Sequence, residues 1–140
     1  MGHNDWTRII IRAENAILKL KELNLVWGKI HEYGNFDKEL PASDYMNKNI
    51  RSGRSMYIHL AGRSNSPSGT EGSFEIFDGD VKIGKFQWEC PYKGDNSIKW
   101  NYAAMDGDNY AEENYKVSTL WHNKTGGALE NVTVICTKIA

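Results

Sequence analysis

Alternation of apolar and polar residues with a period of two is the dominant pattern along this chain. Met56, Ile58 and Leu60 fall on one face of an extended backbone, whereas Tyr57 and His59 fall on the other. Successive side chains of a β-strand point to opposite faces, so this spacing predicts a strand with one buried face. The same period predicts further strands at residues 6–12, 73–77, 80–88, 98–104, 115–121 and 131–139.

The dipeptide Asp78-Gly79 separates two of these predicted strands. A type I′ hairpin turn needs a positive φ at both central residues, which Asp-Gly tolerates. We therefore predict a β-hairpin with these two residues as its loop. Residues typical of turns also separate the other strands, at 62–69, 93–96, 106–109 and 124–127.

Residues 13–27 fit two patterns. A helix would place Ala16, Leu20 and Leu23 on one face, whereas strand alternation runs through the segment with a slip of one residue at 21–22. A slip of this kind is what a β-bulge produces. We favour a bulged strand, because the neighbouring segments are all predicted strands.

Length and composition indicate one domain. The chain has 140 residues, of which 40% are hydrophobic, enough for a single packed core. We therefore expect residues 1–140 to form one all-β domain, a two-sheet antiparallel β-sandwich. With 17 Lys and Arg against 18 Asp and Glu, the chain lacks the basic surplus that nucleic-acid binding requires. No apolar run approaches the roughly 20 residues of a membrane-spanning helix, and no Sec-type signal peptide is recognisable, so we expect a soluble protein, released or cytoplasmic.

Candidate catalytic and metal-binding chemistry is weak throughout the chain. Cys90 and Cys136 are too few for a disulfide framework; a single pairing stays open, but we expect two buried free thiols. The four histidines show no metal-ligand spacing. Residues 79–86 begin like a phosphate-binding loop but end in Phe86, where Ser or Thr is required. We therefore expect neither an enzyme nor a bound cofactor or metal.

Aromatic residues are numerous, with five Trp and seven Tyr. Trp88, Tyr92, Trp100 and Tyr102 surround a single Pro- and Gly-containing turn. For Trp88 and Trp121 we favour packing in the sandwich core, with an exposed aromatic edge as the alternative. For Tyr92, whose neighbours are turn residues, we favour a lipid–water interface, where an apolar ring with a polar tip is stable.

Such an aromatic edge suits a zwitterionic lipid head group. Aromatic faces attract the ammonium of choline or ethanolamine, while Lys93 or Lys99 would meet the adjoining phosphate. For Trp6 and Trp100, core packing and membrane contact are equally open. Exposed aromatic rings also stack on sugars and form protein-interaction hot spots, so carbohydrate binding and protein binding are the alternative functions.

Short motifs spread over nearly the whole chain form an ordered series. They are Trp27-Gly-Lys-Ile-His31, Asp37-Lys-Glu-Leu, Ala42-Ser-Asp-Tyr45, Gly62-Arg-Ser64, Gly69-Thr-Glu-Gly72, Trp88-Glu-Cys-Pro91 followed by Trp100, and Gly126-Gly-Ala-Leu129. Their order and spacing resemble the aegerolysin family, in which the second motif is a short acidic loop and the third lies in a strand. The resemblance implies a β-sandwich similar to actinoporins. It also implies binding to sphingolipid-rich target membranes, often beside a larger pore-forming partner of the perforin-like (MACPF) type.

The resemblance also assigns roles by position. Some members carry a glutamate before the central glycine of the loop at 64–72 and use it to read sphingomyelin with cholesterol. Here that position is Ser68, and the acidic residue is Glu71, which favours ceramide phosphoethanolamine. A pore formed by this chain alone would need residues 13–23 to be an amphipathic helix, and weak self-association stays open. The positions that correspond to membrane-edge residues are Trp6, Trp27, Tyr92 and Lys93.

Overall fold

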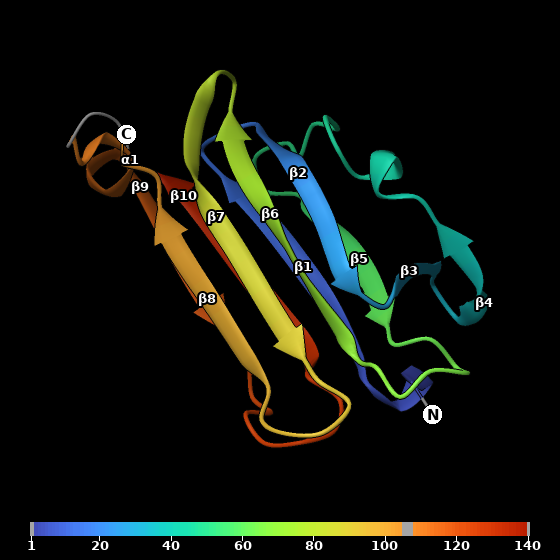
Figure 1. The fold of residues 1–140 in the computed structure, drawn as a ribbon. Helices are drawn as coiled ribbons and strands as arrows, with labels where there is room; N and C mark the ends of the chain where they lie inside the picture. The colour runs from blue at the N-terminus through green and yellow to red at the C-terminus, as the bar shows by residue number, and fades with distance from the viewer. Residues whose placement is uncertain (1, 105–107, 140) are drawn as a thin grey trace.

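Two β-sheets pack face to face in a sandwich (Figure 1). The computed structural model describes residues 2–104 and 108–139. One sheet contains β1 (Trp6–Glu14), β3 (Lys29–Glu32), β4 (Asn35–Leu40), β5 (Ser55–Ala61), β9 (Tyr115–Leu120) and β10 (Glu130–Lys138), in the order β4-β3-β5-β1-β10-β9. The other contains β2 (Leu18–Trp27), β6 (Thr70–Asp78), β7 (Val81–Cys90) and β8 (Ser97–Tyr102), in the order β2-β6-β7-β8. The predicted all-β, two-sheet sandwich is confirmed.

The described part of the chain also contains three short helical segments. They are the 3-10 turns η1 (Gly2–Asn4) and η2 (Ala42–Asp44) and the five-residue helix α1 (Tyr110–Asn114). The strand expected around Tyr45 is therefore wrong, since η2 lies there. The acidic loop expected at residues 37–40 is instead part of β4. The predicted turn at 106–109 falls partly outside the described residues, because 105–107 are not described.

The core lies between the sheets and follows the predicted alternation. In β1, Ile9, Ile11 and Ala13 are fully buried, while the residues between them are partly exposed. From the opposite sheet, Phe74 and Phe86 pack with ring centroids 5.3 Å apart. Burial of one face per strand is what selects this register, because a shift of one residue would turn every apolar side chain outward.

One strand pair departs from the antiparallel prediction. β1 and β10, the first and last strands, are parallel neighbours in the middle of the six-stranded sheet. Parallel pairing needs a long connection between the two strands, and here the connection is nearly the whole chain. The pairing therefore joins the two ends of the sequence, a relation that local alternation does not reveal.

The bulged strand predicted at residues 13–27 is confirmed only for residues 18–27, which form β2; residues 13 and 14 end β1, and residues 15–17 connect the two strands. The pairing of β2 with β6 shifts between Lys21 and Asn24, and Glu22 has a φ of 52°. The bulge keeps both Leu20 and Leu23 in the core, although they are separated by an odd number of positions.

The hairpin between β6 and β7 is confirmed, but its predicted loop is displaced by one residue. Asp78 pairs with Val81, so the two loop residues are Gly79 and Asp80. Gly79 has a φ of 59°, and Asp80 has no positive φ. A positive φ at the first loop residue alone is typical of a type II′ turn with Gly first, whereas the predicted type I′ turn needs it at both.

The two cysteines are buried and unpaired, as expected. Burial raises the pKa of Cys90 to about 11 and that of Cys136 to about 12. Both thiols therefore stay protonated at neutral pH and behave as small core residues. In residues 2–104 and 108–139, no helix is long and apolar enough to cross a bilayer.

Candidate functional site

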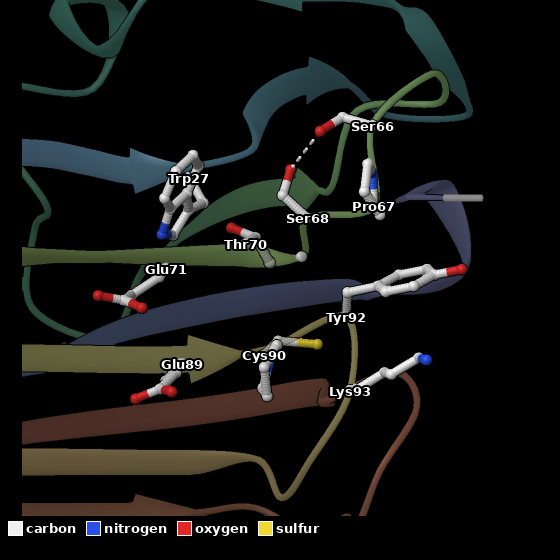
Figure 2. Close-up of a pocket in the computed structure, with 12 residues that line it drawn as sticks. Trp27, Ser66, Pro67, Ser68, Thr70, Glu71, Glu89, Cys90, Tyr92 and Lys93 are labelled. Atoms are coloured by element: carbon white, nitrogen blue, oxygen red, sulfur yellow. Dashed lines mark hydrogen bonds between the residues drawn. The ribbon is translucent and has the colours of Figure 1, made fainter.

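A groove of about 610 Å³ opens at one end of the sandwich (Figure 2). Its walls come from three places: the end of β2, the loop that leads into β6, and the end of β7 with the loop that follows. Five of the predicted site residues line this groove: Trp27, Ser68, Glu71, Tyr92 and Lys93. The structure therefore brings together residues that are up to 66 positions apart in the chain.

Close backbone contacts shape the floor of the groove. A Cβ added at Gly69 would lie 1.8 Å from the carbonyl oxygen of Cys90, and one at Gly28 would lie 2.6 Å from that of Ala61 and 3.0 Å from that of Gly69. Gly28 also has a φ of 87°, which L side chains rarely adopt. Glycine at these two positions lets the loop before β6 approach both β7 and the turn after β2.

The aromatic wall of the groove is exposed to solvent. Trp27 is 58% exposed and pairs across the strands with Glu71. Tyr92 is half-buried and Lys93 is exposed, and Figure 2 shows the hydroxyl and ammonium groups of these two residues pointing to the opposite side from the Glu71 carboxylate. The groove therefore has an anionic aromatic end and a cationic rim.

Two carboxylates lie side by side at the anionic end. Glu71 of β6 and Glu89 of β7 are direct cross-strand partners, and Figure 2 shows both side chains pointing the same way. Burial raises the pKa of Glu71, and the negative charge of Glu89 raises it further. Like charges directly opposite on neighbouring strands are destabilising, so a bound cation would stabilise the pair. Sequence reasoning missed Glu89.

Hydrogen bonds connect the first residues of the 62–69 loop to the rest of the protein. Arg63 donates two hydrogen bonds to the Glu39 carboxylate, of 2.7 and 3.0 Å, and the Gly62 N–H donates to the carbonyl of Asp5. At its far end, the hydroxyls of Ser66 and Ser68 lie 3.1 Å apart (Figure 2).

The remaining four predicted site residues lie outside this groove. Trp6 is partly exposed at the start of β1, opposite Ala61. Lys99 lines a smaller hollow of about 260 Å³ that adjoins the groove and shares Glu71 with it. These two residues remain accessible to a ligand.

Trp88 lies in the core, and Trp100 packs against the core while it stays partly exposed. Trp88 is 1% exposed, and its indole N–H donates to the Thr70 hydroxyl at 3.1 Å. Both observations agree with the predicted core packing, so Trp88 is not part of an exposed aromatic edge. Trp100 is half-buried; a Cβ added at Gly84 would lie 2.6 Å from its ring. We therefore correct Trp88 from a lipid contact to a packing residue, whereas the half-buried Trp100 stays a prediction. Trp121 is also partly buried against the core, as favoured above.

A second group of rings, here called the ring cluster, lies around β3, β4 and β5. Burial lowers the pKa of His3, and the positive charge of Lys29 lowers it further. Burial also lowers the pKa of His59, followed by the effects of His31 and Arg8. Within the described residues, no group of three or more His, Cys, Asp or Glu could hold a metal ion. The ring cluster consists of His3, His31, Tyr33, Phe36 and His59, whose successive ring centroids are 4.7–5.9 Å apart.

Comparison with known proteins identifies the family. A sequence profile of the Aegerolysin family matches residues 4–139. The chain belongs to the aegerolysin family. It is 37% identical over 137 residues to aegerolysin Aa-Pri1 of Cyclocybe aegerita, covering 95% of this chain and 90% of that protein. It is 35% identical over 136 residues to Asp-hemolysin of Aspergillus fumigatus, covering 95% and 92%.

The fold of this aegerolysin agrees with solved structures. The crystal structure of IP-1A from Alcaligenes faecalis superposes with a TM-score of 0.86 at 32% identity, covering 99% of this chain and 94% of that one. The resemblance inferred from the ordered motifs is therefore confirmed. Aegerolysins are membrane-lipid-binding, haemolysin-like proteins. The groove and its rim are therefore the candidate lipid-binding site.

Proposed function

We propose that this aegerolysin binds sphingolipid head groups in the groove and acts as a membrane-targeting protein, not as an enzyme. The observation that carries the proposal is the polarity of the groove. Trp27 and the paired carboxylates of Glu71 and Glu89 lie at one end, and Tyr92 and Lys93 at the other. A phosphate linked to an ammonium has the complementary polarity, with cation–π attraction at the indole and charge pairing at the lysine.

The paired carboxylates favour ceramide phosphoethanolamine over sphingomyelin. A primary ammonium has three hydrogen-bond donors, whereas the quaternary ammonium of choline has none. Between Glu71 and Glu89, a primary ammonium would relieve the like-charge contact and donate to both carboxylates. Ser68 stands where some family members carry a glutamate that they use to read sphingomyelin with cholesterol, and its lack of a carboxylate supports the same preference.

We further propose that the membrane pore is made by a partner protein of the perforin-like (MACPF) type. The segment at residues 13–23, which a lone pore would need as an amphipathic helix, belongs to strands β1 and β2 and their turn. The role of this chain would then be to recognise the lipid and to concentrate its partner on the membrane, with weak self-association as a further expectation.

Vesicle sedimentation tests the lipid proposal. Three mixtures are compared: phosphatidylcholine with cholesterol, sphingomyelin with cholesterol, and ceramide phosphoethanolamine with cholesterol. We expect wild-type protein to sediment with the third. Tyr92→Ala and Glu71→Gln should weaken this binding, whereas their matched controls on α1, Tyr110→Ala and Glu112→Gln, should not. Absence of sedimentation with every sphingolipid, or inhibition by soluble sugar, would move the function to a protein or glycan ligand.

Permeabilisation tests the partner proposal. Vesicles that bind the protein are loaded with a fluorescent dye, and a perforin-like protein is added with or without this chain. Dye release only when both proteins are present is the expected result. Release by this chain alone would contradict the two-component proposal while leaving lipid recognition intact.

A further inference from the structure

The loops at residues 91–96 and 121–129 run side by side at the groove end of the sandwich (Figure 1). Asn96, which is only 4% exposed, joins them. Its side-chain amide donates to the carbonyl oxygens of Asn123 at 3.1 Å and Thr125 at 2.7 Å. Its backbone N–H donates to the carbonyl of Lys124 at 3.1 Å. Because both amide hydrogens are used, the orientation of this side chain is determined.

Cys90, the last residue of β7, connects the start of the 91–96 loop to the 121–129 loop. The Leu129 N–H donates to its sulfur at 3.3 Å, and the sulfur lies 3.5 Å from the Gly127 carbonyl oxygen. A Cβ added at Gly126 would lie 3.4 Å from the carbonyl oxygen of Gly94. These contacts hold the loop with Tyr92 and Lys93 against the 121–129 loop.

The 121–129 loop has the side chains that a lipid surface favours. Lys124 is exposed, and its ammonium lies 5.3 Å from the centroid of the half-buried Trp121 ring. A lysine that extends over an indole keeps its charge in water while its stem covers apolar surface. Lys124 and Lys93 thus place two cations on the joined loops, where phosphates would meet them.

We propose that the 121–129 loop is a second lipid-contacting loop, with Lys124 and Trp121 at the head-group phosphates and Asn96 as the residue that positions both loops. This inference rests on the proposed function, because it extends the same membrane-facing end. It adds a contact surface outside the groove, since neither Trp121 nor Lys124 lines the groove.

A site-specific fluorophore tests whether this loop touches the membrane. Thr125→Cys is labelled with an environment-sensitive dye, and Glu112→Cys on α1 is the matched control. Cys90 and Cys136 are fully buried, so the introduced thiol is the one that reacts. With ceramide phosphoethanolamine/cholesterol vesicles, we expect a blue shift from the Thr125 label and none from the Glu112 label.

The possible failures are distinguishable. Sedimentation of wild-type protein without any shift from the Thr125 label would overturn this inference and leave the proposed function standing. Absence of sedimentation by wild-type protein would overturn both. As a second readout, Lys124→Glu should weaken vesicle binding about fivefold, because it removes one exposed charge pair with a head-group phosphate; binding equal to wild type would contradict the contact.

The positioning role of Asn96 has its own test. Asn96→Ala should weaken vesicle binding. The double variant Asn96→Ala/Tyr92→Ala should weaken it by less than the product of the two single fold-changes in affinity, because both changes act on the same loop. Independent, multiplicative losses would refute positioning. Urea unfolding shows whether each variant is folded under assay conditions; if Asn96→Ala is not, Lys124→Glu and the fluorophore decide the loop's role.

Discussion

Replacing Trp27 by alanine should separate membrane affinity from folding more cleanly than any other single change. Trp27 is 58% exposed, which for a Trp side chain of roughly 250 Å² leaves about 145 Å² in water. At about 25 cal/mol per Å², removing half of that area from water at an interface is worth about 1.8 kcal/mol. The dissociation constant for vesicles should therefore rise roughly twentyfold. Because the ring already lies mostly in water, the free energy of unfolding should fall by less than about 1 kcal/mol.

Two measurements check this prediction. Sedimentation with ceramide phosphoethanolamine/cholesterol vesicles gives the dissociation constant, and urea unfolding gives the stability. Ile17→Ala is the control, since Ile17 is 47% exposed in the turn between β1 and β2, at the other end of the sandwich from Trp27. Unchanged vesicle affinity of Trp27→Ala would refute the assignment of the groove as the membrane-facing end. A loss of stability of several kcal/mol would refute the argument that the ring is free of the core.

Three further predictions concern stability. Gly72→Ala should destabilise the fold by at least about 1–3 kcal/mol in urea unfolding, since its Cβ would lie 2.6 Å from the Trp88 ring; unchanged stability would contradict this packing. Tyr115→Phe removes a 2.5 Å hydrogen bond to the Asp78 carboxylate and should cost about 1.5–3 kcal/mol, whereas the exposed Tyr110→Phe should cost almost nothing. Acidification should destabilise the protein through the ring cluster: two of its imidazoles have a pKa lowered by folding, so the unfolded chain binds protons first. The stability that the two neutral imidazoles contribute is fully present above about pH 7 and declines as the pH falls below about 6.5. Thermal unfolding from pH 8 to 5 should show this loss of stability, and the loss should be smaller in His59→Gln.

Much of the fold follows from the sequence alone. Of the ten strands in residues 2–104 and 108–139, alternation identified seven, and an alternation with a slip at residues 21–22 identified the bulged β2. Alternation succeeds because the side-chain period of a strand is the same as the period with which it is buried in a sandwich. The strands that were missed, β3 and β4, do not alternate: three successive residues of β3 are buried, and all residues of β4 except the last are exposed, so neither strand shows a period of two.

The site depended on tertiary structure for a different reason. A loop at Asp78-Gly79 would have placed Glu71 opposite Phe86. The actual turn is one residue further on, and an irregularity follows at residues 76–77, so Glu71 faces Glu89 instead. A change of register is invisible to composition, yet it creates the paired carboxylates that make the groove anionic.

The aromatic residues show the same division. Sequence alone determined that this chain is rich in Trp and Tyr near one turn, which was enough to suggest an interfacial edge. Only the packing decided that Trp88 is buried with its indole bonded to Thr70, while Trp27 lies open in the groove. Both are tryptophans on strands, and their difference arises from neighbours distant in sequence. The local alternation of apolar and polar residues therefore determines to which face of a sheet a side chain points. Contacts between residues distant in sequence determine whether that face is buried.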